Sequence, residues 1–173
     1  MNINDAKKVI FAAKQAKDAV IMEGKHGIGK SAIVRQVCEE KGYHLEELYL
    51  GTQEKGDIIG NTRTIEHNGD FIHIWTKPSW LKRMEEASTA GKVCMLFLDE
   101  LNRSEPDVRQ TALQLVQEGK IHEHSLPITG NEKTMIVAAI NPDDDESDDY
   151  QVEPLDPALL DRALFFKIEP DVS

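Results

Sequence analysis

Short apolar runs alternate along this chain with stretches in which apolar residues recur every three or four positions. The runs predict strands of a sheet that is covered on both faces, and they lie at 19–22, 44–50, 93–98, 134–140 and 164–168. The periodic stretches predict helices, at about 5–17, 30–41, 79–90, 104–119 and 155–162. Because strands and helices alternate, the pattern predicts an α/β fold, a three-layer sandwich with a mainly parallel, five-stranded sheet.

Two further segments predict β-hairpins inserted into this plan. Asn68-Gly69 lies between the alternating segments Thr62–His67 and Asp70–Trp75. Asn-Gly is a strong hairpin signal because both residues tolerate the left-handed backbone that a tight turn requires. A second, shorter hairpin is predicted over 119–127. We therefore expect a sandwich with two inserted hairpins.

The composition is that of one ordinary globular domain, and we expect residues 1–173 to form it. No apolar run reaches the roughly 18 residues of a membrane span, and the first residues lack the basic and apolar segments of a secretory signal. The two cysteines, Cys38 and Cys94, lie far apart and form no C-x-x-C pair. These features predict a cytoplasmic protein with reduced thiols and no membrane span.

Acidic residues outnumber basic ones. Twenty Lys and Arg stand against 31 Asp and Glu, which gives a net charge of −11. Non-specific affinity for nucleic acid comes largely from basic contacts to phosphates, so this charge argues against a nucleic-acid partner, although a locally basic patch is compatible with the total. The acidic run at 143–149 predicts a solvated loop within the domain.

A complete phosphate-binding pattern, G-x-x-x-x-G-K-S/T, lies between a predicted strand and a predicted helix. Its residues are Gly24, Lys25, His26, Gly27, Ile28, Gly29, Lys30 and Ser31. In such a loop the backbone N–H groups and the positive end of the helix dipole face the phosphates. Lys30 would then contact the β- and γ-phosphates, and the Ser31 hydroxyl would bind Mg²⁺. A glycine-rich turn without a ligand is the alternative.

An acidic pair, Asp99-Glu100, directly follows the apolar run at 93–98. A carboxylate at the end of a buried parallel strand lies at the sheet edge where α/β proteins bind ligands. We expect Asp99 to hold Mg²⁺ opposite Ser31, and Glu100 to orient or deprotonate an attacking water. Two adjacent carboxylates favour hydrolysis over transfer to an organic hydroxyl. A strand that simply ends in polar residues is the alternative.

The segment Phe97–Arg103, which reads FLDELNR, resembles the second nucleotide-binding motif of MoxR-type AAA+ ATPases. The resemblance extends from about Val20 to Pro170. Further segments resemble that family's motifs and occur in its order: the insertion within the second helix, the pre-sensor hairpin, the sensor-one strand and the arginine-finger segment, at 50–69, 119–122, 137–142 and 155–162.

The resemblance implies roles for single residues outside the phosphate-binding loop. Asn141 would be the sensor-one residue, which detects the γ-phosphate; a turn-forming Asn before Pro142 is the alternative. Arg162 would be an arginine finger that reaches a neighbouring subunit's nucleotide, where such a group increases the rate by about 10³–10⁵. A surface arginine paired with a nearby acid is the alternative. Asn102 is a candidate for positioning Glu100 or its water.

The resemblance also implies ATP and Mg²⁺ as cofactors and a homo-oligomeric ring, which is a hexamer in this family. The ring would remodel or activate a protein partner in a chaperone-like way. A helical lid follows the last strand in this family, and we expect none within residues 1–173, because the last predicted strand ends at about 168. An alternative is therefore a nucleotide-binding switch, an inert ATP-binding core with little turnover. A DNA-remodelling AAA+ ATPase is a further alternative, which the net charge disfavours.

Overall fold

The computed structural model describes residues 1–16, 19–142, 157 and 161–169. Its centre is one five-stranded sheet in the order β11-β1-β10-β5-β2, and every pairing in this sheet is parallel. The strands β1, β2, β5, β10 and β11 are Ala19–Glu23, His44–Tyr49, Cys94–Asp99, Met135–Ile140 and Ala163–Lys167. The α/β architecture with a five-stranded parallel sheet is therefore confirmed.

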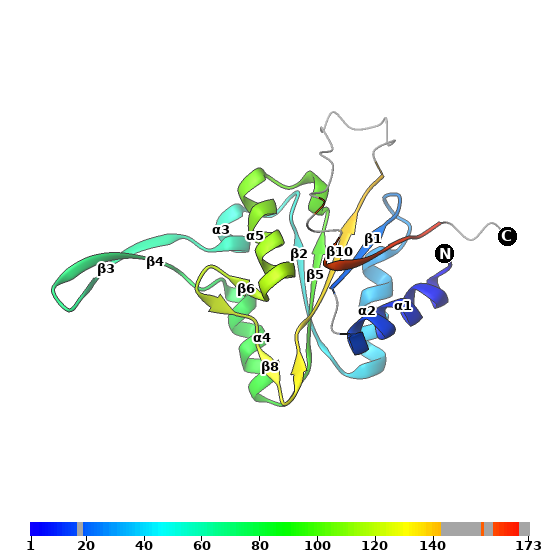
Figure 1. The fold of residues 1–173 in the computed structure, drawn as a ribbon, viewed down its shortest axis with the longest axis horizontal. Coiled ribbons are helices and arrows are strands. Elements are labelled where there is room, and N and C mark those ends of the chain that lie inside the picture. Colours follow the sequence, from blue (N-terminus) through cyan, green and yellow to red (C-terminus); the bar gives the residue numbers. More distant parts are fainter. Residues whose placement is uncertain (17–18, 143–156, 158–160, 170–173) are drawn as a thin grey trace.

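Helices cover both faces of the sheet (Figure 1). The helices α1, α2, α4 and α5 are Ile3–Ala16, Lys30–Lys41, Ser79–Thr89 and Pro106–Glu118. Each face has its own apolar core: Val20 and Met22 pack with α1 and α2, whereas Ile21 between them packs with α4 and α5. This follows from the two-residue period of a strand, and it explains why the strands read as continuous apolar runs.

The sequence patterns did not predict several short elements. These are helix α3 (Lys55–Ile59), the 3₁₀ turn η1 (Leu101–Arg103), and a third hairpin formed by β8 (Ile128–Thr129) and β9 (Glu132–Lys133). None of them is long enough to show a hydrophobic period. The described residues therefore contain three hairpins rather than the expected two.

The segment at 143–149 lies outside the described residues. Of the helix expected at 155–162, only residues 157, 161 and 162 are described, so the structure does not test that helix. Among the described helices, none is long and apolar enough to cross a membrane.

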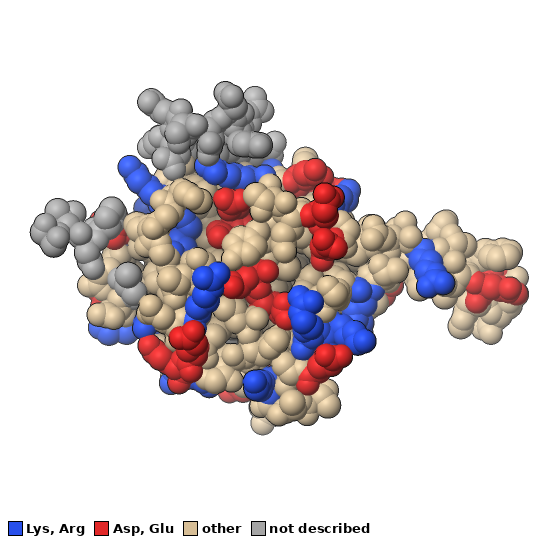
Figure 2. Space-filling view, turned by 180° about the vertical axis from the view of Figure 1, so that it is seen from behind, with Lys and Arg blue, Asp and Glu red and all other residues tan. Residues whose placement is uncertain are grey.

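The longest hairpin extends away from the body (Figure 1). It consists of β3 (Thr62–His67) and β4 (Asp70–Trp75), and its turn residues Asn68 and Gly69 both have positive φ, as predicted. Near the tip, the side chain of Phe71 is exposed, with a residue exposure of 78%. The surface view shows acidic and basic side chains interspersed over the body and the hairpin (Figure 2).

The base of this hairpin contacts the second hairpin, β6 (Lys120–Ile121) with β7 (His124–Ser125). The rings of Trp75 and His122 stack with 3.7 Å between their centroids. A ring nitrogen of His124 lies 3.2 Å from the Trp75 carbonyl oxygen, and the Trp75 N–H donates to Glu123. The predicted hairpins, which are about 50 residues apart in sequence, therefore form one joined unit beside α5.

Candidate functional site

The phosphate-binding loop Gly24–Ser31 follows β1 at the carboxyl edge of the sheet, and its last two residues begin α2. Gly27 and Gly29 have φ values of 78° and 95°, a backbone conformation that side chains with a Cβ rarely adopt. A Cβ at either position would meet no atom within 4 Å, so these glycines serve the backbone conformation and not a tight contact. Helix α2 begins without a side-chain cap, and its first N–H groups have no partner within the helix.

Lys30 is the first residue of α2, and its side chain turns back into this loop. The residue is 7% exposed. Its Nζ donates to the carbonyl oxygens of Gly24 and Lys25, the latter at 3.1 Å, and to Asn141 Oδ1 at 2.9 Å. All of these acceptors are uncharged. These contacts hold the ammonium group inside the loop, where a bound phosphate would lie next to it.

Asn141 directly follows β10, and it is 3% exposed. Its Oδ1 accepts from Lys30, whereas its Nδ2 is buried and has no hydrogen-bond partner among the described residues. Such an unsatisfied buried donor costs about 1–3 kcal/mol. A ligand that supplies an acceptor would remove this cost. The phosphate-binding pattern indicates that this acceptor is a phosphate oxygen.

The acidic pair lies at the end of β5, two strands from β1 at the same edge of the sheet: Asp99 is the last residue of β5, and Glu100 follows it. Asp99 Oδ1 accepts the Glu100 N–H at 2.9 Å. Burial raises the pKa of the Asp99 carboxyl, while this hydrogen bond and the charges of Lys30 and His26 act in the opposite direction. Glu100 has a φ of 57°, a left-handed conformation that costs a non-glycine residue about 1–3 kcal/mol.

The Glu100 side chain lies against Gly51, the second residue after β2. A Cβ at Gly51 would stand 2.7 Å from Glu100 Oε2, closer than real contacts allow, and 3.5 Å from Arg103 Cβ. The absence of a side chain at position 51 therefore makes room for the Glu100 carboxylate. Sequence reasoning assigned Gly51 no role at the site. The feature of the sequence that could have indicated this role is a glycine just after a strand that ends at the ligand-binding edge of the sheet.

Asn102, a candidate for positioning Glu100 or its water, binds the backbone of Asn141 with both ends of its side-chain amide. Nδ2 donates to the Asn141 carbonyl at 2.8 Å, and Oδ1 accepts the Asn141 N–H at 3.3 Å. The 3₁₀ turn η1, which carries Asn102, is thereby joined to the end of β10.

Ser31 lies half-buried in the first turn of α2, at the same sheet edge as Asp99. These two side chains supply a hydroxyl and a carboxylate oxygen, the kind of ligand that Mg²⁺ prefers. No cluster of three or more His, Cys, Asp or Glu side chains capable of holding a metal occurs among the described residues. A phosphate-bound Mg²⁺ is the metal that fits this donor set, because phosphates and waters supply its remaining ligands.

Arg162 lies apart from these residues. It is exposed and directly precedes β11. Ala163, the first residue of β11, pairs with Ala19, the first residue of β1, whereas the phosphate-binding loop follows the last residue of β1. The structure therefore brings Lys30, Asp99, Glu100 and Asn141 to one edge of the sheet and leaves Arg162 at the other.

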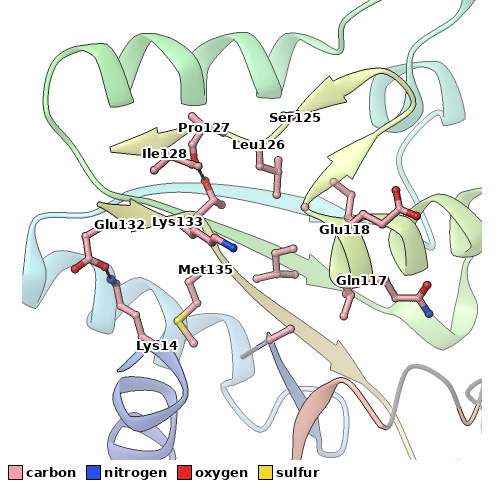
Figure 3. A pocket seen from close by; sticks show the side chains of 16 residues that line it. Lys14, Gln117, Glu118, Ser125, Leu126, Pro127, Ile128, Glu132, Lys133 and Met135 are labelled. Atoms are coloured by element: carbon pink, nitrogen blue, oxygen red, sulfur yellow. Dashed lines mark hydrogen bonds and ion pairs between the residues drawn. The ribbon is translucent and has the colours of Figure 1, made fainter. Parts of the chain in front are cut away.

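A cavity of about 320 Å³ also opens at that other edge. It lies between α5, the hairpin β8–β9 and the start of β10, with Leu126 and Met135 in its lining. Figure 3 shows the ion pair between Lys14 and Glu132 at its side. None of the residues singled out in the sequence as functional lines it, so this cavity is separate from the candidate site.

Comparison with known families identifies the family of the chain. Residues 19–163 match the family described as "AAA domain (dynein-related subfamily)". The chain belongs to this family. Membership in this ATPase family supports a nucleotide as the ligand of the loop. The more specific resemblance to MoxR-type proteins is not decided by this match.

A solved structure shares the fold of this AAA domain. It is the crystal structure of a candidate ATPase from Cytophaga hutchinsonii, which matches with a TM-score of 0.59 at 18% sequence identity. The match covers 96% of this chain and 46% of that chain, so the AAA domain described here spans less than half of the length of that protein.

Proposed function

We propose that this AAA domain binds Mg-ATP at Gly24–Ser31 and hydrolyses it. The observation that carries the proposal is the contact between Lys30 of the loop and Asn141 at the end of β10. The buried Lys30 ammonium contacts Asn141 Oδ1 inside the loop, and the buried Asn141 Nδ2 has no hydrogen-bond partner among the described residues. A γ-phosphate oxygen next to these two groups would accept a hydrogen bond from Asn141 Nδ2 and would carry the charge opposite to that of the Lys30 ammonium.

Ser31 and Asp99 are the residues that would hold Mg²⁺. When bound, Mg²⁺ neutralises charge on the β- and γ-phosphate oxygens. Asp99 has to be ionised for this role. The nearby Lys30 and His26 charges favour ionisation and oppose the effect of burial on its pKa.

Glu100 is the proposed general base, which takes the proton of the attacking water. Its left-handed backbone lets the chain turn directly after the strand, so that two successive carboxylates face the same edge of the sheet. Its carboxylate lies beside Gly51. Asn141 would orient the water and the γ-phosphate, and its own position is fixed by its backbone contacts.

Arg162 is proposed to act on the nucleotide of a neighbouring copy. The five-residue strand β1 separates its end of the sheet from the loop, a length of roughly 16 Å, so a site on the same chain is out of its reach. This supports a ring, in the MoxR-type manner a hexamer. The exposed Phe71 on the projecting hairpin offers an apolar contact to a protein partner, in line with a chaperone-like remodelling function.

Phosphate release over a range of protein concentrations tests this proposal. We expect turnover per chain to rise with concentration as copies assemble and complete each other's sites. Binding of ATP without phosphate release at any concentration would support the alternative, a nucleotide-binding switch with little turnover. A DNA-remodelling activity would instead require that duplex DNA stimulates turnover and that salt weakens the stimulation.

A further inference from the structure

Asn102 is a buried polar residue with a contact pattern that the proposed chemistry does not use. It is 2% exposed. Its side-chain amide pairs with both backbone groups of one residue, the N–H and the C=O of Asn141. Neighbouring strands of a sheet pair in the same way, through backbone N–H and C=O groups. Here a side-chain amide takes the place of the neighbouring strand's backbone.

The contact between Asn102 and Asn141 lies beyond the point where the pairing of β10 with β5 ends. The backbone pairing between β10 and β5 runs from Met135 with Met95 to Ala138 with Leu98, and it ends there. On the other side of β10, the pairing with β1 continues to Ile140. Asn141 therefore lies just beyond the strand pairing. On the β5 side, the backbone of Asn141 contacts the side chain of Asn102, three residues after the end of that strand.

We propose that Asn102 is a positioning residue for Asn141, which sets the distance between the sensor amide and the acidic pair that ends β5. This inference rests on the proposed function of the site. Asn141 in turn contacts Lys30. The Asn102 contact therefore connects the end of β5 to Asn141, and through Asn141 to Lys30 of the phosphate-binding loop. Displacing Asn141 would then affect recognition of the γ-phosphate, which ATP has and ADP lacks.

Asparagine suits this position because it presents one acceptor and one donor at a fixed spacing. Asn102→Asp keeps the shape and the acceptor for the Asn141 N–H, but it turns the donor into a second acceptor facing the Asn141 carbonyl. Asn102→Leu keeps the number and branching of the side-chain heavy atoms, although its methyl groups are larger than the amide, and it removes both hydrogen bonds. Asn131→Asp, at an exposed position in the turn between β8 and β9, is a matched control for the change in charge.

The experiment measures ATP and ADP affinities of the full chain by calorimetry, with thermal unfolding of each variant recorded in parallel. For Asn102→Asp and Asn102→Leu we expect ADP affinity within about twofold of wild type and a loss of ATP preference of about tenfold or more, the effect of one hydrogen bond to a charged oxygen. The Asn131→Asp control should keep the wild-type ratio. Amide hydrogen exchange at Asn141 should become faster in both Asn102 variants, and this readout requires no nucleotide.

A double-mutant cycle separates positioning from a general structural role. If Asn102 acts through Asn141, then Asn102→Leu should change the ATP preference little when Asn141→Ala is already present. Additive losses, or equal losses of ATP and ADP affinity, would overturn the inference. So would an unchanged ATP to ADP ratio in a folded Asn102→Asp variant while Asn141→Ala lowers that ratio. Absence of ATP binding by the wild-type chain would instead overturn the proposed function, and with it this inference.

Discussion

The ammonium group of Lys30 donates a hydrogen bond to the side-chain oxygen of Asn141 at 2.9 Å, although the two residues are 111 positions apart in the sequence. They meet because β1 and β10 are adjacent parallel strands, whose carboxyl ends lie side by side. Lys30 follows β1 by one loop, and Asn141 directly follows β10. The contact therefore joins the phosphate-binding loop to the neighbouring strand end.

Lys30→Ala should abolish nucleotide binding. The change removes the buried charge of the loop and leaves Asn141 without its partner. We expect ATP affinity to fall by about 100-fold or more, since each hydrogen bond to a charged group contributes about 1.5–3 kcal/mol. Isothermal calorimetry measures this directly, and Lys82→Ala on the exposed face of α4 serves as the control. Unchanged affinity would refute the assignment of the loop.

Glu100→Gln should separate binding from turnover. Glutamine has nearly the shape of glutamate but cannot accept a proton from water. ATP affinity should therefore stay close to wild type, while phosphate release falls by about 10²–10⁴-fold, the usual contribution of a general base. Normal turnover in this variant would exclude Glu100 as the base.

Gly51→Ala should impair turnover without a change in the catalytic groups themselves. The added methyl group would stand 2.7 Å from Glu100 Oε2, so the carboxylate has to move. We expect a lower kcat with little change in nucleotide affinity, measured in the same phosphate-release assay. Thr52→Ala, at the exposed neighbouring position, should behave as wild type. An equal effect of both substitutions is incompatible with a steric role of Gly51.

The pKa of Asp99 predicts an effect of pH on stability. Burial raises this pKa above the ordinary value of 3.8, so the folded chain binds the proton more tightly than the unfolded chain does. Asp99 therefore costs stability as pH rises from about 3.8 through its raised value, and the full cost is present above it. Asp99→Asn should raise the melting temperature of the nucleotide-free chain at neutral pH and abolish the Mg²⁺ dependence of ATP binding. A lower melting temperature would contradict this account.

Arg162→Ala tests action between subunits. Because Arg162 lies at the opposite edge of the sheet from its own loop, ATP affinity should remain while assembly-dependent hydrolysis falls by about 10³-fold or more. A mixture of Arg162→Ala and Glu100→Gln chains should recover part of the activity, since some interfaces then combine an intact base with an intact arginine. Failure to recover activity at every mixing ratio would count against the assignment.

Much of the fold was predictable because the parallel strands are buried on both faces and therefore read as continuous apolar runs. The phosphate-binding loop was predictable because its chemistry is contained in eight consecutive residues. The contacts that arrange the site were not. Asn102 and Asn141 are 39 residues apart, and no pattern in the sequence around either residue predicts their contact. Gly51 matters because it has no side chain and so leaves room for Glu100. That close approach is visible only in the structure.

Calorimetric titration of the chain with ATP, in the presence and absence of Mg²⁺, tests the central claim most directly. The account predicts saturable ATP binding that Mg²⁺ strengthens and that Lys30→Ala abolishes. The same titration with Asp99→Asn should show no strengthening by Mg²⁺. ATP binding of equal strength in wild type and Lys30→Ala, or no binding at millimolar ATP under conditions in which copies assemble, would contradict the assignment of Gly24–Ser31 as a nucleotide site.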